Sequence, residues 1–276
     1  MSPAIRSVFV PAASLLLLCA IWEALIWAYD VPNFRMASPS DIAGALVKFP
    51  CTLSIAPAGG DVGFWDRVAF DCLFVERTWQ TLWRTVAGLA VAVVIGTGIG
   101  VIMGFSRIAR EGLYPILVGF NAIPKATVVP IIALIFVGQH NFNTVMIAFM
   151  ISFFPIAVSV SIGLSTLEPE YRDILRSLGA SNLQVFWKIA LPKTLPEFFG
   201  ALKVAVTLAF IGTNLMEIVS PHGRGLGALF DSGRTSADYP LMFAVLLLLA
   251  ALGILLFYIV VAMERVFAGW AERAPA

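Results

Sequence analysis

Long apolar runs with almost no charge are the feature that most constrains how this chain can fold. The clearest run, residues 241–263, contains 23 residues without one charged side chain. A helix of about 20 apolar residues crosses the roughly 30 Å hydrocarbon core of a bilayer. Backbone groups in lipid must find their hydrogen bonds inside the segment, so such runs fold as helices. We therefore expect an all-α membrane protein.

Further runs bring the set to about six transmembrane helices. The expected spans are 8–29, 80–105, 113–138, 143–165, 195–219 and 240–264. Residues 1–276 then form a single transmembrane domain, and the first span is expected to be retained because its apolar stretch exceeds that of a signal peptide. Only 13% of the residues are charged, against about 25% in soluble domains. A net charge of +1 gives no electrostatic basis for binding nucleic acid.

The distribution of basic residues predicts the orientation of the chain. With the amino terminus inside, nine Lys and Arg residues fall in cytoplasmic segments and six fall outside. Cytoplasmic loops carry the excess of basic residues in membrane proteins. We therefore expect both termini in the cytoplasm, together with the polar segment 168–192.

Small residues and prolines indicate how the spans pack. The second span carries a small residue at every fourth position: Gly88, Ala92, Gly96, Gly100 and Gly104. That spacing lines one helix face and predicts close approach of a neighbouring helix.

The third span contains Pro115, Pro124 and Pro130, and the fourth contains Pro155. Each proline removes a backbone donor and kinks the helix. Such a kink is either purely structural or lies beside a substrate path.

The segment 168–192 is a polar island between the fourth and fifth spans. Apolar residues at helical spacing from position 171 to 178 predict a short helix, and Gly179 fits as the left-handed residue that ends it. A second short helix is expected over 183–189, with Leu191 and Pro192 ending it and starting the fifth span. A hairpin of this length between spans indicates a protein partner, although a solvated loop is the alternative.

The spacing within this segment resembles the signature of permease subunits of bacterial ATP-binding-cassette (ABC) importers. That signature reads E-A-A, three residues, G, nine residues, then I-x-L-P. The chain has Asp-Ile-Leu in place of Glu-Ala-Ala. The resemblance implies docking onto a cytoplasmic ATPase through the matching positions, which are Asp173, Gly179, Ala180, Ile189, Leu191 and Pro192.

Other stretches are similar to the nitrate, sulfonate and taurine subfamily of these permeases. They are residues 32–40, 82–88, 123–126, 216–217 with 225–227, and 263–265. The long loop between the first two spans departs from the subfamily. The resemblance implies the type I importer permease fold in the bacterial cytoplasmic (inner) membrane. Besides the lipid bilayer, it implies three protein partners: a cytoplasmic ATPase dimer, an extracytoplasmic solute-binding protein and a second copy of the chain.

The chain lacks a Walker-type G-x-x-x-x-G-K-[ST] motif, so ATP and Mg²⁺ are expected on the partner ATPase. We expect a transport subunit without enzyme activity or a cofactor of its own, carrying a sulfonate, taurine, nitrate or similar organic anion. A thiamine-precursor pyrimidine or a flavin is the alternative solute. An ion-gradient-driven secondary transporter is the alternative from another class, and it predicts inverted repeats that the two halves do not display.

Four polar residues within the spans are candidates for the translocation path: Asn121, Lys125, Asn214 and Glu217. Ionisable groups at membrane depth face a cavity or a partner, so Glu217 serves either the path or a structural bond. Lys125 could attract an anion or pair with an acidic residue. Lys203 is expected to snorkel to the interface, and Arg84 to lie near the outer boundary.

The cysteines and histidines give little further information. Cys51 and Cys72 fall in the outer loop, either bridged or as free thiols, whereas Cys19 lies in the first span. His140 and His222 are far apart in sequence, which predicts no metal site.

Overall fold

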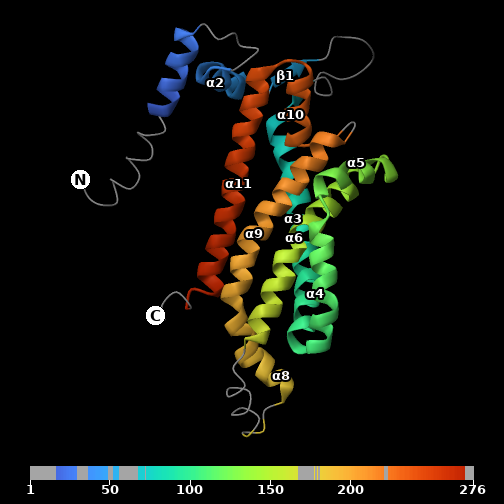
Figure 1. The fold of residues 1–276 in the computed structure, drawn as a ribbon. Helices are drawn as coiled ribbons and strands as arrows, with labels where there is room; N and C mark the ends of the chain where they lie inside the picture. The colour runs from blue at the N-terminus through green and yellow to red at the C-terminus, as the bar shows by residue number, and fades with distance from the viewer. Residues whose placement is uncertain are drawn as a thin grey trace, which may run out of the picture.

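The structure is a computed structural model that describes residues 17–29, 37–48, 52–55, 68–71, 73–166, 177, 179, 181–220 and 223–270. Its long helices run side by side in one bundle (Figure 1). In chain order the elements are α2 (Pro39–Lys48), β1 (Thr52–Ile55), β2 (Val68–Asp71), α3 (Leu73–Phe105), α4 (Arg107–Ala122), α5 (Lys125–Ile135), α6 (His140–Ser165), α8 (Asn182–Val185), a π-helix (Phe186–Ala190), α9 (Leu191–Val219), α10 (Leu226–Thr235) and α11 (Tyr239–Phe267).

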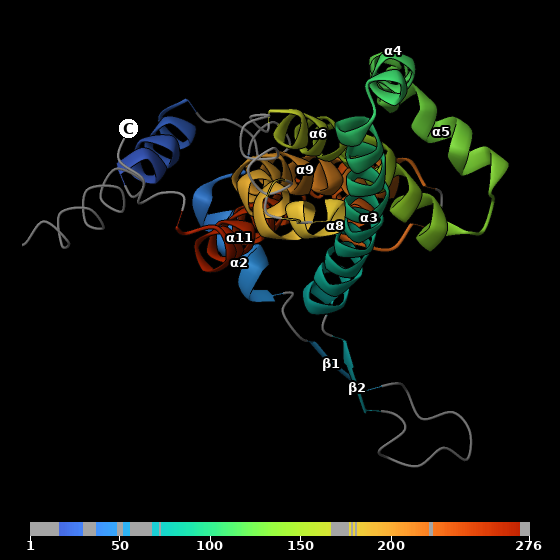
Figure 2. The ribbon, with the colours of Figure 1, turned by 90° about the horizontal axis from the view of Figure 1, so that it is seen from below.

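Helix α6 forms the centre of the bundle, between α3 and α9. Its side chains Ile147 and Ile156 are completely buried. Helix α11 packs on α9 and α10, and α2 packs on α11. Seen from below, α4 and α5 lie on the side of the bundle away from α11 (Figure 2).

The small-residue stripe of α3 faces α6, as its spacing predicted. A Cβ added at Gly96 would lie 2.9 Å from the Phe153 carbonyl oxygen. One added at Gly100 would lie 2.7 Å from the Val160 Cβ. Helices can approach this closely only where side chains are missing, so the stripe sets the distance between α3 and α6.

The third predicted span, 113–138, is divided between two helices, a sharper break than the kinks that its prolines predicted. Helices α4 and α5 meet at an angle of 83°. Pro124 disfavours a helical backbone at the residue before it, and Ile123 accordingly has extended dihedrals (φ −60°, ψ 128°). By contrast, Pro115 and Pro130 lie inside helices.

The fifth span begins earlier than predicted. Leu191 and Pro192 were expected to end a short helix, but α8, the π-helix and α9 follow one another without a break. The segment Trp187–Val219 is a single candidate span. Pro192 occupies the first turn of α9, where its missing N–H is tolerated, and the wider π turn precedes it.

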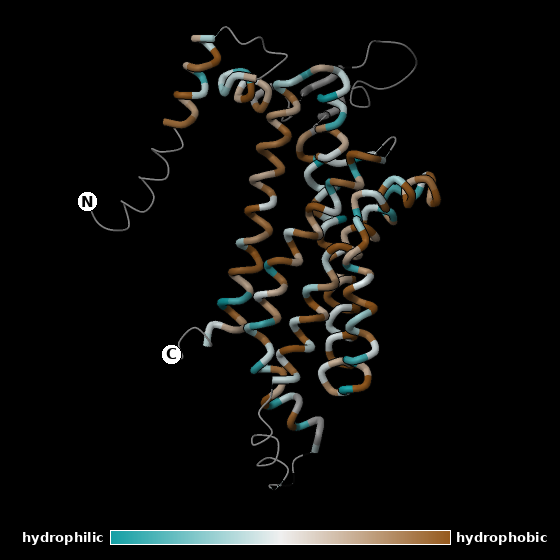
Figure 3. Tube along the Cα trace, in the orientation of Figure 1, coloured by the Kyte–Doolittle hydropathy of each residue, from teal (hydrophilic) through white to brown (hydrophobic). Residues whose placement is uncertain are grey.

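Among the described residues, four helices are long and apolar enough to cross a membrane, and the bent pair α4 and α5 makes up to five. Hydrophobic residues extend along most of α11 (Figure 3). The first predicted span lies partly outside the described residues, which include the short apolar helix Leu17–Ala28.

The helix Leu17–Ala28 is attached to the bundle through polar and aromatic contacts. The Glu23 carboxylate accepts hydrogen bonds from the backbone N–H of Ser40 (3.1 Å) and from its hydroxyl (2.8 Å). This carboxylate therefore satisfies an otherwise unpaired N–H at the start of α2. The Trp22 ring lies 6.2 Å from that of Phe243 on α11. In the loop before α3, β1 and β2 form an antiparallel pair.

Candidate functional site

Glu217 is the centre of a buried polar cluster at the end of α9 remote from α8. Its side chain is 1% exposed. The carboxylate accepts hydrogen bonds from the Thr81 hydroxyl at 2.8 Å and from the Gly227 backbone N–H at 3.0 Å. It also forms an ion pair with Arg84 at 3.1 Å. A buried charge of this kind is stable only when such partners surround it.

The partners of Glu217 extend the cluster to four helices. Arg84 Nε donates to Asn141 Oδ1 on α6 at 3.0 Å, and Arg84 Nη1 donates to the Arg224 carbonyl before α10. The Thr81 hydroxyl accepts from the Leu226 backbone N–H at 2.8 Å. The cluster therefore fastens α3, α6, α9 and α10 together.

A second pair of hydroxyls extends the buried polar cluster by one helical turn. Thr85 donates to Thr213 at 3.0 Å, and both residues are completely buried. Thr81 and Thr85 are four residues apart, as are Thr213 and Glu217. This matched spacing on two spans is the sequence signal that could have identified Thr81, Thr85 and Thr213, which the sequence analysis missed.

The loop before α10 is fitted around the Glu217 carboxylate. Gly225 has φ +136°, a conformation that favours glycine. A Cβ at Gly225 would overlap the Glu217 carboxylate, and one at Gly227 would lie 2.8 Å from the Glu217 Cβ. The sequence 225–227, Gly-Leu-Gly, is therefore explained by contact with Glu217.

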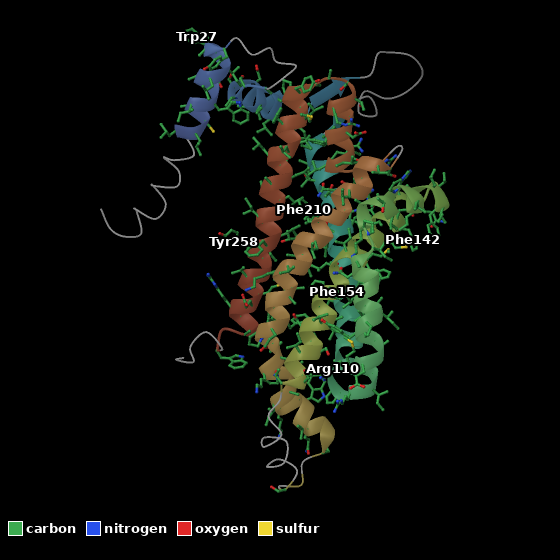
Figure 4. All side chains as sticks on the ribbon, in the orientation of Figure 1. Trp27, Arg110, Phe142, Phe154, Phe210 and Tyr258 are labelled. Atoms are coloured by element: carbon green, nitrogen blue, oxygen red, sulfur yellow. The ribbon has the colours of Figure 1, made fainter. Side chains whose placement is uncertain are left out.

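Of the two interpretations of Glu217, the geometry favours the structural bond. Both of its carboxylate oxygens accept hydrogen bonds from protein donors, and Arg84 is buried with it. Asn214 does not join this cluster. Its Nδ2 donates to the Phe210 carbonyl at 2.8 Å, and it lines a groove of about 810 Å³ between α9 and α11. Phe210 and Tyr258, labelled in Figure 4, line the same groove.

A polar cavity of about 630 Å³ lies beside the Glu217 cluster, where α6 begins. Its polar lining includes Gln80, Arg84, His140, Asn141 and Arg224. Of the lining residues that the structure describes, none is acidic. The cavity therefore offers donors and positive charge at the end of the bundle opposite α8.

Asn121 and Lys125 lie on the two sides of the break between α4 and α5. Lys125 Nζ donates to Asn121 Oδ1 at 2.8 Å and also to the Asn121 carbonyl. This lysine thus satisfies a carbonyl at the end of α4, as basic side chains do at helix C-termini. The structure brings these two candidates together, and their hydrogen bonds join them to each other and not to Glu217. No acidic partner of Lys125 is found among the described residues.

The opposite end of the bundle carries the predicted coupling residues. Gly179 is exposed and has φ +80°, the left-handed conformation predicted for it. Ile189 is half-buried in the π-helix, while Leu191 and Pro192 form the first turn of α9. Asp173 and Ala180 lie outside the described residues.

Lys203, which the sequence analysis expected to snorkel to the interface, forms an ion pair with a residue of α11. Its Nζ lies 2.8 Å from Glu264 on α11, and both side chains are largely buried. Glu264 therefore joins α9 to α11 in the half of the bundle nearer α8. Arg110, labelled in Figure 4, similarly donates to the Met103 carbonyl at the end of α3.

Cys51 and Cys72 lie outside the described residues, next to the ends of the two strands. Their neighbours Thr52 and Asp71 face each other in the β1–β2 ladder. Cys19, in the helix Leu17–Ala28, is a free thiol.

Comparison with protein families assigns most of the chain. Residues 92–268 match the family described as the binding-protein-dependent transport system inner membrane component. This stretch extends from within α3 to the end of α11 and includes the coupling segment.

Several curated proteins are similar over most of their length. The formylaminopyrimidine transport permease ThiX of Halalkalibacterium halodurans is 31% identical, over 74% of this chain and 80% of its own. The riboflavin transport permease RibX of Chloroflexus aurantiacus is 28% identical, over 93% and 88% of the two chains. The taurine transport permease TauC of Escherichia coli is 25% identical, over 97% and 92%.

The fold is also found in a solved structure of the MetNI methionine ABC transporter in an inward-facing conformation. The match has a TM-score of 0.60 at 23% identity and covers 71% of this chain and 96% of the other. Together with the family match and the apolar spans, it agrees with the resemblance seen in the sequence. The chain therefore belongs to the binding-protein-dependent transport system inner membrane component family, and it is a multi-pass permease subunit of a type I ABC importer.

Proposed function

We propose that this permease forms the path of a small solute across the inner membrane, driven by a separate ATPase. The solute would arrive from an extracytoplasmic binding protein, and ATP and Mg²⁺ would be bound by the ATPase. The main support is the exposed turn at Gly179, which lies in the family's coupling segment at one end of the bundle.

The coupling segment has the features of a docking surface. Gly179 is needed for its backbone conformation alone, because a Cβ there would meet no atom within 4 Å. The segment continues through α8 and the π-helix directly into α9. A push on the segment would therefore be transmitted along a continuous helix to the Glu217 cluster, roughly 40 Å away by helix rise. The proposal puts α8 and both termini in the cytoplasm, in agreement with the distribution of basic residues.

The broken span α4–α5 is the part of the fold that we place beside the path. Non-helical backbone at membrane depth is tolerated where it lines a cavity or is buried in protein. Helix α5 projects from the bundle (Figure 1), and Leu134 and Ile135 on it are 74% and 66% exposed. A second copy of the chain would cover this side, with the path between the two subunits. In this arrangement Asn121 and Lys125 would face the path.

Two solute classes have support of different kinds. An N–H-bearing heterocycle is supported by ThiX and RibX, whose names give formylaminopyrimidine and riboflavin. An organic anion is supported by TauC and by the arginines of the outer cavity. We favour the heterocycle because ThiX has the higher identity, and the organic anion is the second candidate.

Variants of Gly179 test the coupling by co-purification from native membranes. A branched residue at φ +80° is a strong outlier, whereas asparagine adopts this conformation far more readily. We expect Gly179→Val to lose the ATPase that wild type retains, and Gly179→Asn to keep it. Equal retention by Gly179→Val and wild type, with both folded in the membrane, would contradict the proposed role of the turn.

A further inference from the structure

The polar cavity of about 630 Å³ where α6 begins has walls that the buried ion pair holds in place. The Arg84 guanidinium contacts two of the lining residues at once. Its Nε donates to Asn141 Oδ1 at 3.0 Å, and its Nη1 donates to the Arg224 backbone carbonyl. Because Arg84 is itself paired with Glu217, these contacts fix the Asn141 side chain and the Arg224 backbone from inside the protein.

The contacts with Arg84 leave hydrogen-bond donors unused on both residues. An Nε–H group can only donate, so Asn141 Oδ1 is the accepting atom and Nδ2 is a free donor. Asn141 is exposed, and its Nδ2 has no partner among the described residues. The Arg224 side chain is also exposed, and it forms no ion pair with any residue that the structure describes. An amide donor and a guanidinium are therefore open to a ligand in one cavity.

The charges around this cavity favour an anion. Of the lining residues that the structure describes, none is acidic. Glu217 offsets the charge of Arg84, whereas the exposed Glu76 accepts a hydrogen bond from Gln80 at 2.8 Å and is not part of the lining. The 26-residue helix α6 begins in the same wall without a side-chain cap, so its first N–H groups also favour negative charge.

The other walls fit an anion that is carried by a protein. An exposed ion pair with a free small anion contributes little, because water and salt screen both charges. A carboxylate on a protein surface gains more, since neighbouring contacts hold it at the cavity at a high effective concentration. Trp83 and Phe142 offer such contacts, since both line the cavity and Phe142, labelled in Figure 4, is 49% exposed. Tryptophan and arginine are among the residues that contribute most at protein interfaces.

We infer that this cavity is a socket, formed by Trp83, Asn141, Phe142 and Arg224, for an acidic side chain of the extracytoplasmic binding protein. The carboxylate accepts hydrogen bonds from the Arg224 guanidinium and from Asn141 Nδ2, and the two rings contact the residues beside it. Arg84 is a positioning residue, because it holds Asn141 and Arg224 in place. The inference rests on the proposed function, which puts this end of the bundle on the outer side of the membrane.

Association of the permease–ATPase complex in nanodiscs with the binding protein that co-purifies with it tests the socket. Arg224→Glu should weaken the association by about tenfold to a hundredfold, because charge reversal replaces attraction by repulsion. It should also reduce the dependence of the affinity on salt concentration. Arg224→Lys keeps the charge but loses the bidentate geometry, so its affinity should lie between those of wild type and Arg224→Glu.

Arg234→Glu is the matched control, with the same change of charge on α10. Arg234 is 62% exposed, is paired with Asp231 at 2.7 Å and is not part of the cavity lining. This variant should associate with the binding protein as wild type does. The Arg224 variants should keep the unfolding temperature of wild type, because the described hydrogen bond of Arg224 is made by its backbone carbonyl.

Three results would contradict the socket, and each has a different meaning. Equal affinity of Arg224→Glu and Arg234→Glu for the binding protein would overturn the inference and leave the proposed importer in place. Taurine bound by wild type and lost in Arg224→Glu, with the affinity for the binding protein unchanged, would overturn it because the cavity would then take a free anion. A wild-type complex that keeps its ATPase but associates with no binding protein would contradict the proposed function and the socket together.

Discussion

Glu217 shows how a charge at membrane depth can be structural. Thr81, Arg84 and Gly227 supply donors to both carboxylate oxygens, and Gly225 leaves room for them. The sequence alone identified the glutamate but could not reveal its partners, because they come from segments more than a hundred residues away or across a turn. Only the matched spacing of Thr81 with Thr85 and of Thr213 with Glu217 gave a local signal.

Removal of one charge from the Glu217–Arg84 pair should destabilise the fold strongly. Glu217→Leu leaves the Arg84 guanidinium buried without its counter-ion, which costs about 3–5 kcal/mol. The double variant Arg84→Met with Glu217→Leu should recover part of this loss. Thermal unfolding in detergent measures both, and a double variant no more stable than Glu217→Leu would contradict the pairing.

At the scale of elements, the sequence predicted the helices better than their breaks. The stripe of α3 could be predicted because glycine spacing directly sets a helix face. The bend at Pro124 was missed because a proline allows either a kink or a break, and hydropathy does not distinguish them. The continuous helix through Pro192 was missed because the proline was expected to end a helix. The π turn that precedes it has no sequence pattern of its own.

Paired glycine variants on α3 test whether the stripe sets helix packing. Gly100→Ala would place a Cβ 2.7 Å from the Ala157 carbonyl oxygen, whereas Gly98→Ala would meet nothing within 4 Å. Overpacking of this kind costs about 1–3 kcal/mol. We expect Gly100→Ala to lower the unfolding temperature and Gly98→Ala to leave it unchanged or raise it. The same unfolding temperature for both would show that α3 and α6 are not held at this distance.

The register of β1 and β2 bears on whether Cys51 and Cys72 are bridged, which the sequence left open. Thr52 faces Asp71, so one more pair in the same ladder would bring Cys51 opposite Cys72. Opposed residues in an antiparallel pair have Cα separations within the range that a disulfide spans. We predict a peptide linked through both cysteines in non-reducing mass spectrometry of protein from native membranes. Quantitative alkylation of both thiols without reduction would exclude the bridge.

At the scale of the whole molecule, the two ends of the bundle have different tasks. One end presents the Gly179 turn and α8, and the other holds the Glu217 cluster and the polar cavity beside it, with α9 extending between them. The fold class and the family were predictable from the sequence, because apolar runs and the coupling spacing are both local patterns. The polar cavity beside Glu217 was not, since it depends on how α3, the start of α6 and the loop before α10 come together.

The most direct test of the central claim is solute uptake by the reconstituted complex. The permease, with the ATPase that co-purifies with it, would be placed in proteoliposomes, and uptake of the solute delivered by the binding protein would be measured. We predict accumulation when the ATPase is supplied with ATP, and none with an imposed proton or sodium gradient alone. Accumulation driven by such a gradient without ATP would contradict the account and favour a secondary transporter.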